Sequence, residues 1–117
     1  MRNPFESLRL PGIHGQVATN SFKSRTIHSI GDCVLQIRTA ELQPGIWDFG
    51  YLLIIGTERI ANLPGEGSGW FKTEDDAQLY ALGYIKTKRT DLPEDMIYAI
   101  DRTIDKLRNV PLFDFDD

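Results

Sequence analysis

Residues 46–89 read IWDFGYLLIIGTERIANLPGEGSGWFKTEDDAQLYALGYIKTKR, and this stretch decides the fold of the chain. It predicts a strand over 46–56, a turn at Thr57-Glu58, a strand over 59–63, a glycine-rich loop over 64–69 and a helix over 70–89. Every odd position of the first strand is apolar or aromatic, namely Trp47, Phe49, Tyr51, Leu53 and Ile55. Side chains two residues apart share one face of a strand, so this face must be covered, and the following helix can cover it.

A second hairpin precedes this stretch. Gly31-Asp32 is a two-residue connection between a short β-branched run at 26–30 and a strand at 33–42. A three-residue loop at 43–45 then aligns residues of one face, and the aligned pairs are Leu35 with Leu53, Ile37 with Tyr51, and Thr39 with Phe49. A two-residue loop shifts the register and sets the carboxylates of Glu41 and Asp48 opposite each other. The longer loop is therefore predicted. A weaker period-two pattern at 13–22 also favours a strand.

Two helices follow the strands. Thr73 is a capping residue, and the first helix has acids in its first turn and cations in its last, as the helix dipole favours. Its apolar arc is so wide that both sides should be covered. In the second helix Asp91 is expected to cap, Pro93 lies in the first turn, and apolar residues recur at spacings of three and four: Ile97, Ile100, Ile104 and Leu107. Asn109 and Pro111 should end this helix.

The predicted fold class is α+β, an antiparallel β-meander of about four strands followed by two C-terminal α-helices packed on one face. The strands should run from about residue 27 to residue 63. Residues 1–117 are predicted to form a single domain, with an irregular lead-in at 1–12 and an acidic, aromatic tail at 109–117. Such a chain is long enough to bury about two-thirds of its unfolded surface. The residues expected to be largely buried are Tyr51, Leu53, Tyr80, Ala81 and Ile97.

The composition is typical of a soluble globular protein, with 41% hydrophobic and 26% charged residues. The single cysteine, Cys33, excludes an internal disulfide framework and a cysteine-based zinc cluster, and it is expected to be an inert, half-buried thiol. The N-terminal residues include no apolar run of signal-peptide length, and no stretch has the length of a membrane span. We therefore expect a cytoplasmic location without membrane contact.

No pattern typical of catalysis or of a cofactor site occurs. The glycines at 64–69 let backbone N–H groups approach an anion, but their spacing differs from that of nucleotide-binding motifs, so a flexible connection is favoured. His14 and His28 lack further ligands at metal-site spacing. No nucleophile-elbow motif is present. We expect no enzyme activity, no cofactor and no metal, and we expect the charges of Glu58 and Arg59 at a hairpin tip to face water.

Residues 46–85 combine strands, a Gly-X-Gly-Ser loop and an alanine-containing helix. In outline they resemble the C-terminal half of double-stranded RNA-binding domains, over a little more than a third of the chain. That family holds phosphates with lysines at the start of the helix. Here these positions are Glu74, Asp75 and Asp76, which repel phosphate. The resemblance therefore implies a fold and not RNA binding.

Two segments are candidate interaction sites. In the tail, aromatic residues can dock in a pocket while acids meet basic residues. The candidate partner-binding residues are Trp70, which precedes the first helix and is expected to be partly exposed, and the tail residues Leu112, Phe113, Asp114, Phe115 and Asp116. The alternatives are a frayed end and a tail folded back on the basic N-terminal segment. Residues 1–30 hold four basic residues and one acidic residue, whereas the remainder holds nine basic and sixteen acidic residues. The candidate nucleic-acid contacts are therefore Arg2, Arg9, Lys23 and Arg25, although this segment is more simply placed against the acidic body of its own chain.

The predicted function is a non-enzymatic, cytoplasmic protein–protein interaction module. Its partner is another protein or a second copy of the chain. Nucleic-acid binding through the basic N-terminal segment is the second hypothesis, and a small-molecule enzyme is the third. Added salt separates the first two, because affinity for nucleic acid falls steeply as the salt concentration rises.

Overall fold

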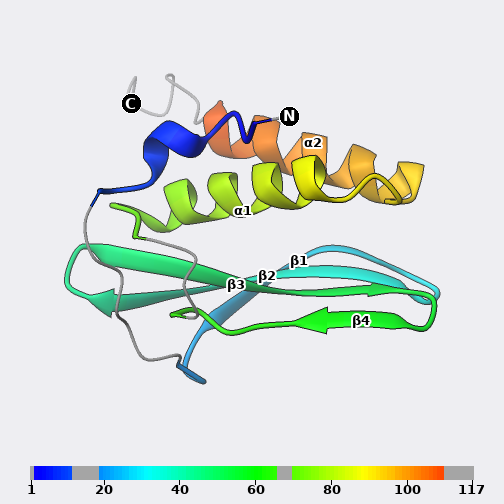
Figure 1. The fold of residues 1–117 in the computed structure, drawn as a ribbon, viewed down its shortest axis with the longest axis horizontal. Coiled ribbons are helices and arrows are strands. Elements are labelled where there is room, and N and C mark those ends of the chain that lie inside the picture. Colours follow the sequence, from blue (N-terminus) through cyan, green and yellow to red (C-terminus); the bar gives the residue numbers. More distant parts are fainter. Residues whose placement is uncertain (1, 12–18, 66–69, 110–117) are drawn as a thin grey trace, which may run out of the picture.

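The computed structural model describes residues 2–11, 19–65 and 70–109. It has two layers, a four-stranded antiparallel sheet and two helices that lie on one side of it (Figure 1). The strands lie in sequence order, and they are β1 (Lys23–Ile30), β2 (Cys33–Gln43), β3 (Ile46–Ile55) and β4 (Glu58–Ala61). The helices are α1 (Glu74–Lys88), α2 (Glu94–Arg108) and a short 3-10 helix, η1 (Glu6–Leu8). The predicted α+β meander with two C-terminal helices on one face is confirmed.

The predicted register between β2 and β3 is also confirmed. The aligned pairs are Leu35 with Leu53, Ile37 with Tyr51, and Thr39 with Phe49. The three-residue loop is wrong, because Gln43 pairs with Ile46 and leaves Pro44 and Gly45 as the turn. A bulge between Glu41 and Gln43 absorbs the additional residue, so the upstream register is kept.

The other two hairpins turn at glycine. Gly31-Asp32 forms the predicted connection, and Gly31 has a φ of 60°. The predicted turn at Thr57-Glu58 is wrong by one residue, since Ile55 pairs with Glu58 and Gly56 takes a φ of 63°. A positive φ is least costly without a Cβ, which places the glycine inside the turn. Of the weak pattern at 13–22, residues 13–18 lie outside the described residues and 19–22 are not in a strand.

The helices cover the face of the sheet that carries the odd-numbered residues of β2 and β3. α1 packs on these two strands, while α2 packs on α1 and β1. α1 is buried over most of its circumference, as its wide apolar arc predicts. Leu53, Tyr80 and Ala81 are buried as expected. Tyr51 and Ile97 are only half-buried, which corrects the prediction: both pack against the margin of the core rather than inside it.

The start of α1 follows the prediction, and the start of α2 does not. Thr73 caps α1, because its Oγ1 accepts a hydrogen bond from the Asp76 N–H at 3.0 Å. The preceding Trp70 and Phe71 are not helical and instead form isolated bridges, with Leu10 and Trp47 respectively. The expected cap at Asp91 is wrong. α2 begins after Pro93 with no side-chain cap, and the Asp91 carboxylate has another partner.

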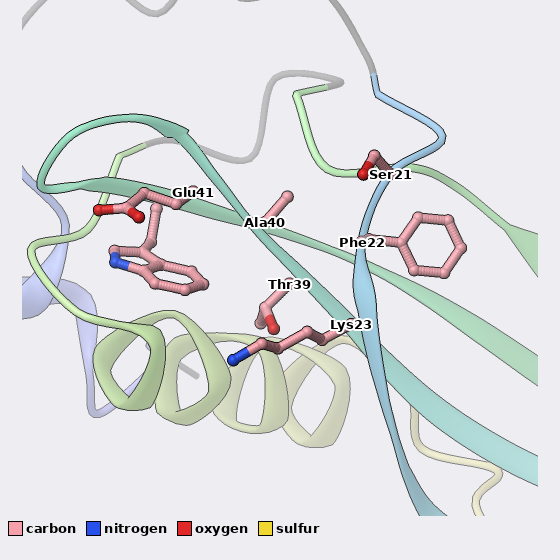
Figure 2. Close-up of a pocket in the computed structure, with 7 residues that line it drawn as sticks. Ser21, Phe22, Lys23, Thr39, Ala40 and Glu41 are labelled. Carbon is pink, nitrogen blue, oxygen red and sulfur yellow. The ribbon is translucent and has the colours of Figure 1, made fainter.

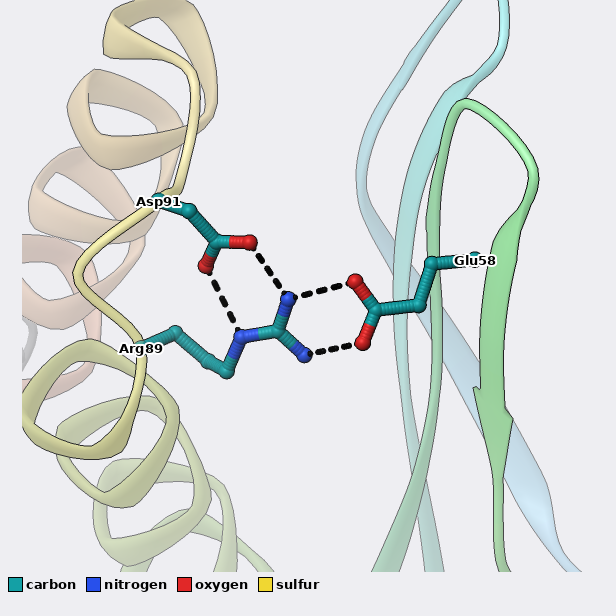
Figure 3. Close-up of polar contacts among 3 residues, drawn as sticks. All are labelled: Glu58, Arg89 and Asp91. Atoms are coloured by element: carbon teal, nitrogen blue, oxygen red, sulfur yellow. Dashed lines mark hydrogen bonds and ion pairs between the residues drawn. The ribbon is translucent and has the colours of Figure 1, made fainter.

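The Asp91 carboxylate binds Arg89, which joins the helical layer to the last hairpin (Figure 3). Its guanidinium donates to both oxygens of Asp91, at 2.6 and 2.9 Å, and to both oxygens of Glu58, at 2.8 and 3.0 Å. The planar guanidinium suits such paired contacts with carboxylates. Hydrogen bonds from Arg89 lower the pKa of Asp91. The expectation that the charge of Glu58 simply faces water is therefore wrong.

Candidate protein-binding surface

One face of the sheet is turned away from α1 and α2 (Figure 1), and the strand register places several apolar residues on it. We call it the open face. The register places Val34 opposite Ile54, Gln36 opposite Leu52, and Ala61 of β4 opposite Leu52. Val34, Leu52 and Ile54 are half-buried. On the covered face, by contrast, the most buried strand residues are at most 2% exposed, and these are Leu35, Ile37, Thr39 and Leu53.

The sequence contains a signal for this surface that the odd positions of β3 alone do not reveal. Residues 51–55 read YLLII and are apolar on both faces of the strand. A strand with one face in water normally alternates apolar and polar residues. The odd positions predict the buried face, whereas the even positions Leu52 and Ile54 add a second apolar face. Apolar residues on the second face favour contact with another apolar surface.

Two arginines lie on the open face. Arg59 is exposed and pairs with Ile54 in the register. The Arg38 guanidinium lies 4.9 Å from the centre of the Phe22 ring and donates to the Asn62 carbonyl at 3.3 Å. Within the described strands, the acidic residue on this face is Asp48, which is 2% exposed. The exposed charge of the open face is therefore positive, although the chain carries a formal net charge of −4.

Asp48 anchors the segment that closes one end of the open face. Residues 62–65 cross close to β3, and a Cβ on Gly50 would lie 2.7 Å from the carbonyl carbon of Leu63. Asp48 accepts hydrogen bonds from the Gly65 N–H at 2.9 Å and from the Phe49 N–H at 2.7 Å. Burial raises the pKa of Asp48 to about 6. The glycine-rich loop thus begins with a fixed contact to the sheet, and its residues 66–69 lie outside the described residues.

A pocket of about 520 Å³ lies where the chain before β1 separates from the end of β2 (Figure 2). The Lys23 ammonium lies 3.6 Å from Glu74 Oε1 and 5.9 Å from the centre of the Trp47 ring. The Thr39 hydroxyl donates to the other Glu74 oxygen at 2.9 Å. Glu41 also lines the pocket. Two carboxylates beside one ammonium give no excess of positive charge, so the pocket does not favour an anion.

The four candidate nucleic-acid contacts are distributed along the chain's own surface. Arg9 lies 3.8 Å from Glu6, Lys23 contacts Glu74, and Arg25 donates to Gln78 Oε1 at 3.0 Å. Arg2 is exposed and lines a separate pocket with Glu6, Tyr84 and Lys88. Glu74, in the first turn of α1, is thus paired with Lys23 of the same chain. Two of the four residues, Arg9 and Lys23, therefore lie against acidic residues of their own chain.

The predicted partner-binding residues fall into two groups. Trp70 is half-buried, and its backbone carbonyl accepts a hydrogen bond from the Leu10 N–H at 2.8 Å. It therefore ties the N-terminal segment to the residues before α1. The other candidates lie outside the described residues: Leu112, Phe113, Asp114, Phe115 and Asp116.

The predicted histidines do not form a described metal site. His28 is 8% exposed within β1, and His14 lies outside the described residues. Among residues 2–11, 19–65 and 70–109, no group of three or more histidine, cysteine, aspartate or glutamate side chains is placed to hold a metal ion. In the same part of the chain, no helix is long and apolar enough to cross a membrane.

Comparison of the chain with models of known protein families, with curated proteins and with solved structures gives no match. Nothing is therefore carried over from the outline resemblance to double-stranded RNA-binding domains.

Proposed function

We propose that this protein is a non-enzymatic, cytoplasmic protein–protein interaction module that binds its partner through the open face. The observation that carries the proposal is the half-buried cluster of Val34, Leu52 and Ile54, which the strand register places on the side of the sheet away from both helices. An apolar centre with a polar margin is the usual anatomy of a protein interface. Contiguous apolar patches at a protein surface mark sites of association when they are rimmed by polar residues.

The partner is a second protein whose contact surface is apolar at its centre and acidic at its margin. Arg59 and Arg38 provide the positive charges that such a margin complements. A two-fold contact between copies would place the same patch against itself. The arginines of the two copies would then face each other. In the described strands, neither open face has an exposed carboxylate that could neutralise them. Charge thus favours a different protein over a second copy.

The edges of the sheet are less suited to binding than its open face. β1 is interrupted by a register shift between Thr26 and His28, and β4 is four residues long. Bulges and short edge strands are features that hinder the addition of a further strand. The proposed contact is therefore made by side chains of the open face and not by backbone pairing.

A photo-crosslinking amino acid at position 52 of the full chain, in cells of the native host, tests the proposal. The matched control carries it in place of Tyr98, which is 66% exposed on α2. We expect a protein adduct from position 52 that position 98 does not give. Arg59→Glu should reduce this adduct several-fold, because charge reversal at an interface margin slows association.

Four results would count against the proposal. Adducts of equal yield at positions 52 and 98, or no protein adduct at 52, would remove the open face as the binding surface. An adduct formed with a second copy alone would replace the acidic partner by self-association. An adduct formed with nucleic acid, together with binding of the purified protein to nucleic acid that weakens steeply as salt is added, would favour the second hypothesis instead.

A further inference from the structure

A groove lies between the N-terminal segment and the two helices. It has a volume of about 400 Å³. Phe5 and Ile104 give it apolar walls, while Lys86, Asp101 and Arg108 border it. Figure 1 shows the N-terminal segment passing across the helical layer on the side away from the sheet. The groove is therefore on a different part of the molecule from the open face.

The N-terminal wall of this groove is part of the fold. A Cβ on Gly83 would collide with Asn3 Oδ1 and would lie 2.8 Å from Phe5 Cδ2, so the glycine allows the segment to rest on α1. Asn3 Nδ2 donates to the Tyr80 carbonyl at 3.0 Å. The Tyr80 hydroxyl in turn donates to Glu6 Oε1 at 3.2 Å. These contacts form the wall without any occupant of the groove.

The charges at the border of the groove are mainly positive. The Lys86 ammonium lies 2.6 Å from Asp101 Oδ1. The Arg108 guanidinium lies 5.9 Å from the centre of the Phe5 ring. Two cations and one carboxylate leave a positive excess beside the apolar walls. Such a groove complements a segment that carries both aromatic and acidic side chains.

The chain itself contains such a segment immediately after α2. Residues 112–117 read LFDFDD, in which aromatic and acidic residues alternate. Phe113 is five residues after Arg108, which is a reach of up to roughly 17 Å. Ile104 lies one helical turn before Arg108, about 6 Å along the axis. Proline has no backbone N–H, so Pro111 does not favour continuation of the helix toward Phe113.

We propose that the groove binds the C-terminal segment of its own chain. Phe113 enters between Phe5 and Ile104, and the aspartates that follow lie against Arg108 and Lys86. The phenylalanine contributes most of the affinity, because exposed ion pairs alone contribute little. This contact is independent of the open face, so it does not depend on the proposed function.

Binding of a synthetic peptide with the sequence of residues 110–117, labelled at its N-terminus, tests this proposal by fluorescence anisotropy. The acceptors are the full wild-type chain and the full chain with Phe113→Ser and Phe115→Ser. A tethered segment competes at an effective concentration in the millimolar range. We therefore expect the peptide to bind the double variant about tenfold or more tightly than the wild type.

Charge variants locate the peptide on the double variant. Arg108→Glu is an exposed change at the groove and should weaken peptide binding several-fold, whereas Arg102→Glu is the matched change on the other side of α2 and should leave it within about twofold. Equal affinity for wild type and double variant, or no binding to either, overturns the proposal. A wild-type dimer in sedimentation that becomes a monomer in the double variant also overturns it, because the segment then binds a neighbouring copy.

Discussion

The two faces of the sheet are built from the same strands but differ in what lies against them. On the covered face the ring of Phe71 lies 6.0 Å from that of Phe49 and 5.0 Å from that of Tyr80. On the open face Leu52 and Ile54 are half-buried beside an exposed arginine. Neighbouring residues of β3 alternate between the two faces. Stability and binding should therefore be separable by substitutions at adjacent positions.

The largest expected effect comes from Leu53, which is 2% exposed on the covered face. Leu53→Ala removes packed methyl groups and leaves a cavity, so the free energy of unfolding in urea should fall by roughly 2–5 kcal/mol. Leu52→Ala is the same change on the open face and should cost under about 1 kcal/mol while weakening partner binding. Equal losses of stability at positions 52 and 53 would contradict the distinction between the faces.

The second prediction concerns the end of the open face, where residues 62–65 cross close to β3. Gly50→Ala would place a Cβ against the backbone of residues 62–63, and overpacking of this kind lowers the free energy of unfolding by roughly 1–3 kcal/mol. Ala61→Ser, an exposed change on β4, should stay within about 0.5 kcal/mol of the wild type. Urea unfolding of both variants measures the difference. A neutral Gly50→Ala would show that residues 62–65 can move off this end of the face.

The third prediction concerns pH and Asp48. Its pKa in the folded state is about 6 against an ordinary value of 3.8, so the folded state binds the proton first as the pH falls. Asp48 therefore adds stability as the pH is lowered from 7 to 5, on the order of 1 kcal/mol. Comparison with Asp48→Asn by urea unfolding at both pH values isolates this contribution, since other groups titrate in both proteins. A difference between the two proteins that stays constant with pH would contradict the raised pKa.

The fold was predictable where a local pattern and a buried face agreed. The alternation of 46–56 and the opposed like charges of Glu41 and Asp48 selected the register that the structure shows. The loop was not predictable in the same way, because a bulge and a shorter turn give the same register as a longer loop. The position of Gly56 inside its turn was open to prediction from its conformational freedom and was overlooked.

The candidate site was less predictable than the fold, for two physical reasons. Leu52 and Ile54 are ordinary strand residues, and their exposure depends on which side the helices pack. The contacts of Arg89 join residues 31 positions apart in sequence, and no local pattern reports such a pairing. Asp91 met the local criteria for a cap, but the guanidinium two residues earlier holds its carboxylate instead.

The smallest expected effects distinguish the faces at two adjacent residues of β4. Glu58 points to the helical layer and accepts two hydrogen bonds from Arg89, whereas Arg59 is exposed and pairs with Ile54 in the register of the open face. Because the Glu58 side chain is 50% exposed, its ion pair is screened, and Glu58→Ala should lower the free energy of unfolding by about 0–1 kcal/mol.

High salt should reduce this loss, and partner binding should be unchanged in Glu58→Ala. Arg59→Ala should show the reverse behaviour: its free energy of unfolding should stay within about 0.5 kcal/mol of the wild type, while binding to the partner slows and becomes less dependent on salt. Urea unfolding and association kinetics at two salt concentrations measure both quantities. If Glu58→Ala impairs binding as much as Arg59→Ala does, the partner contacts the hairpin tip rather than the open face, because adjacent strand residues reach opposite faces.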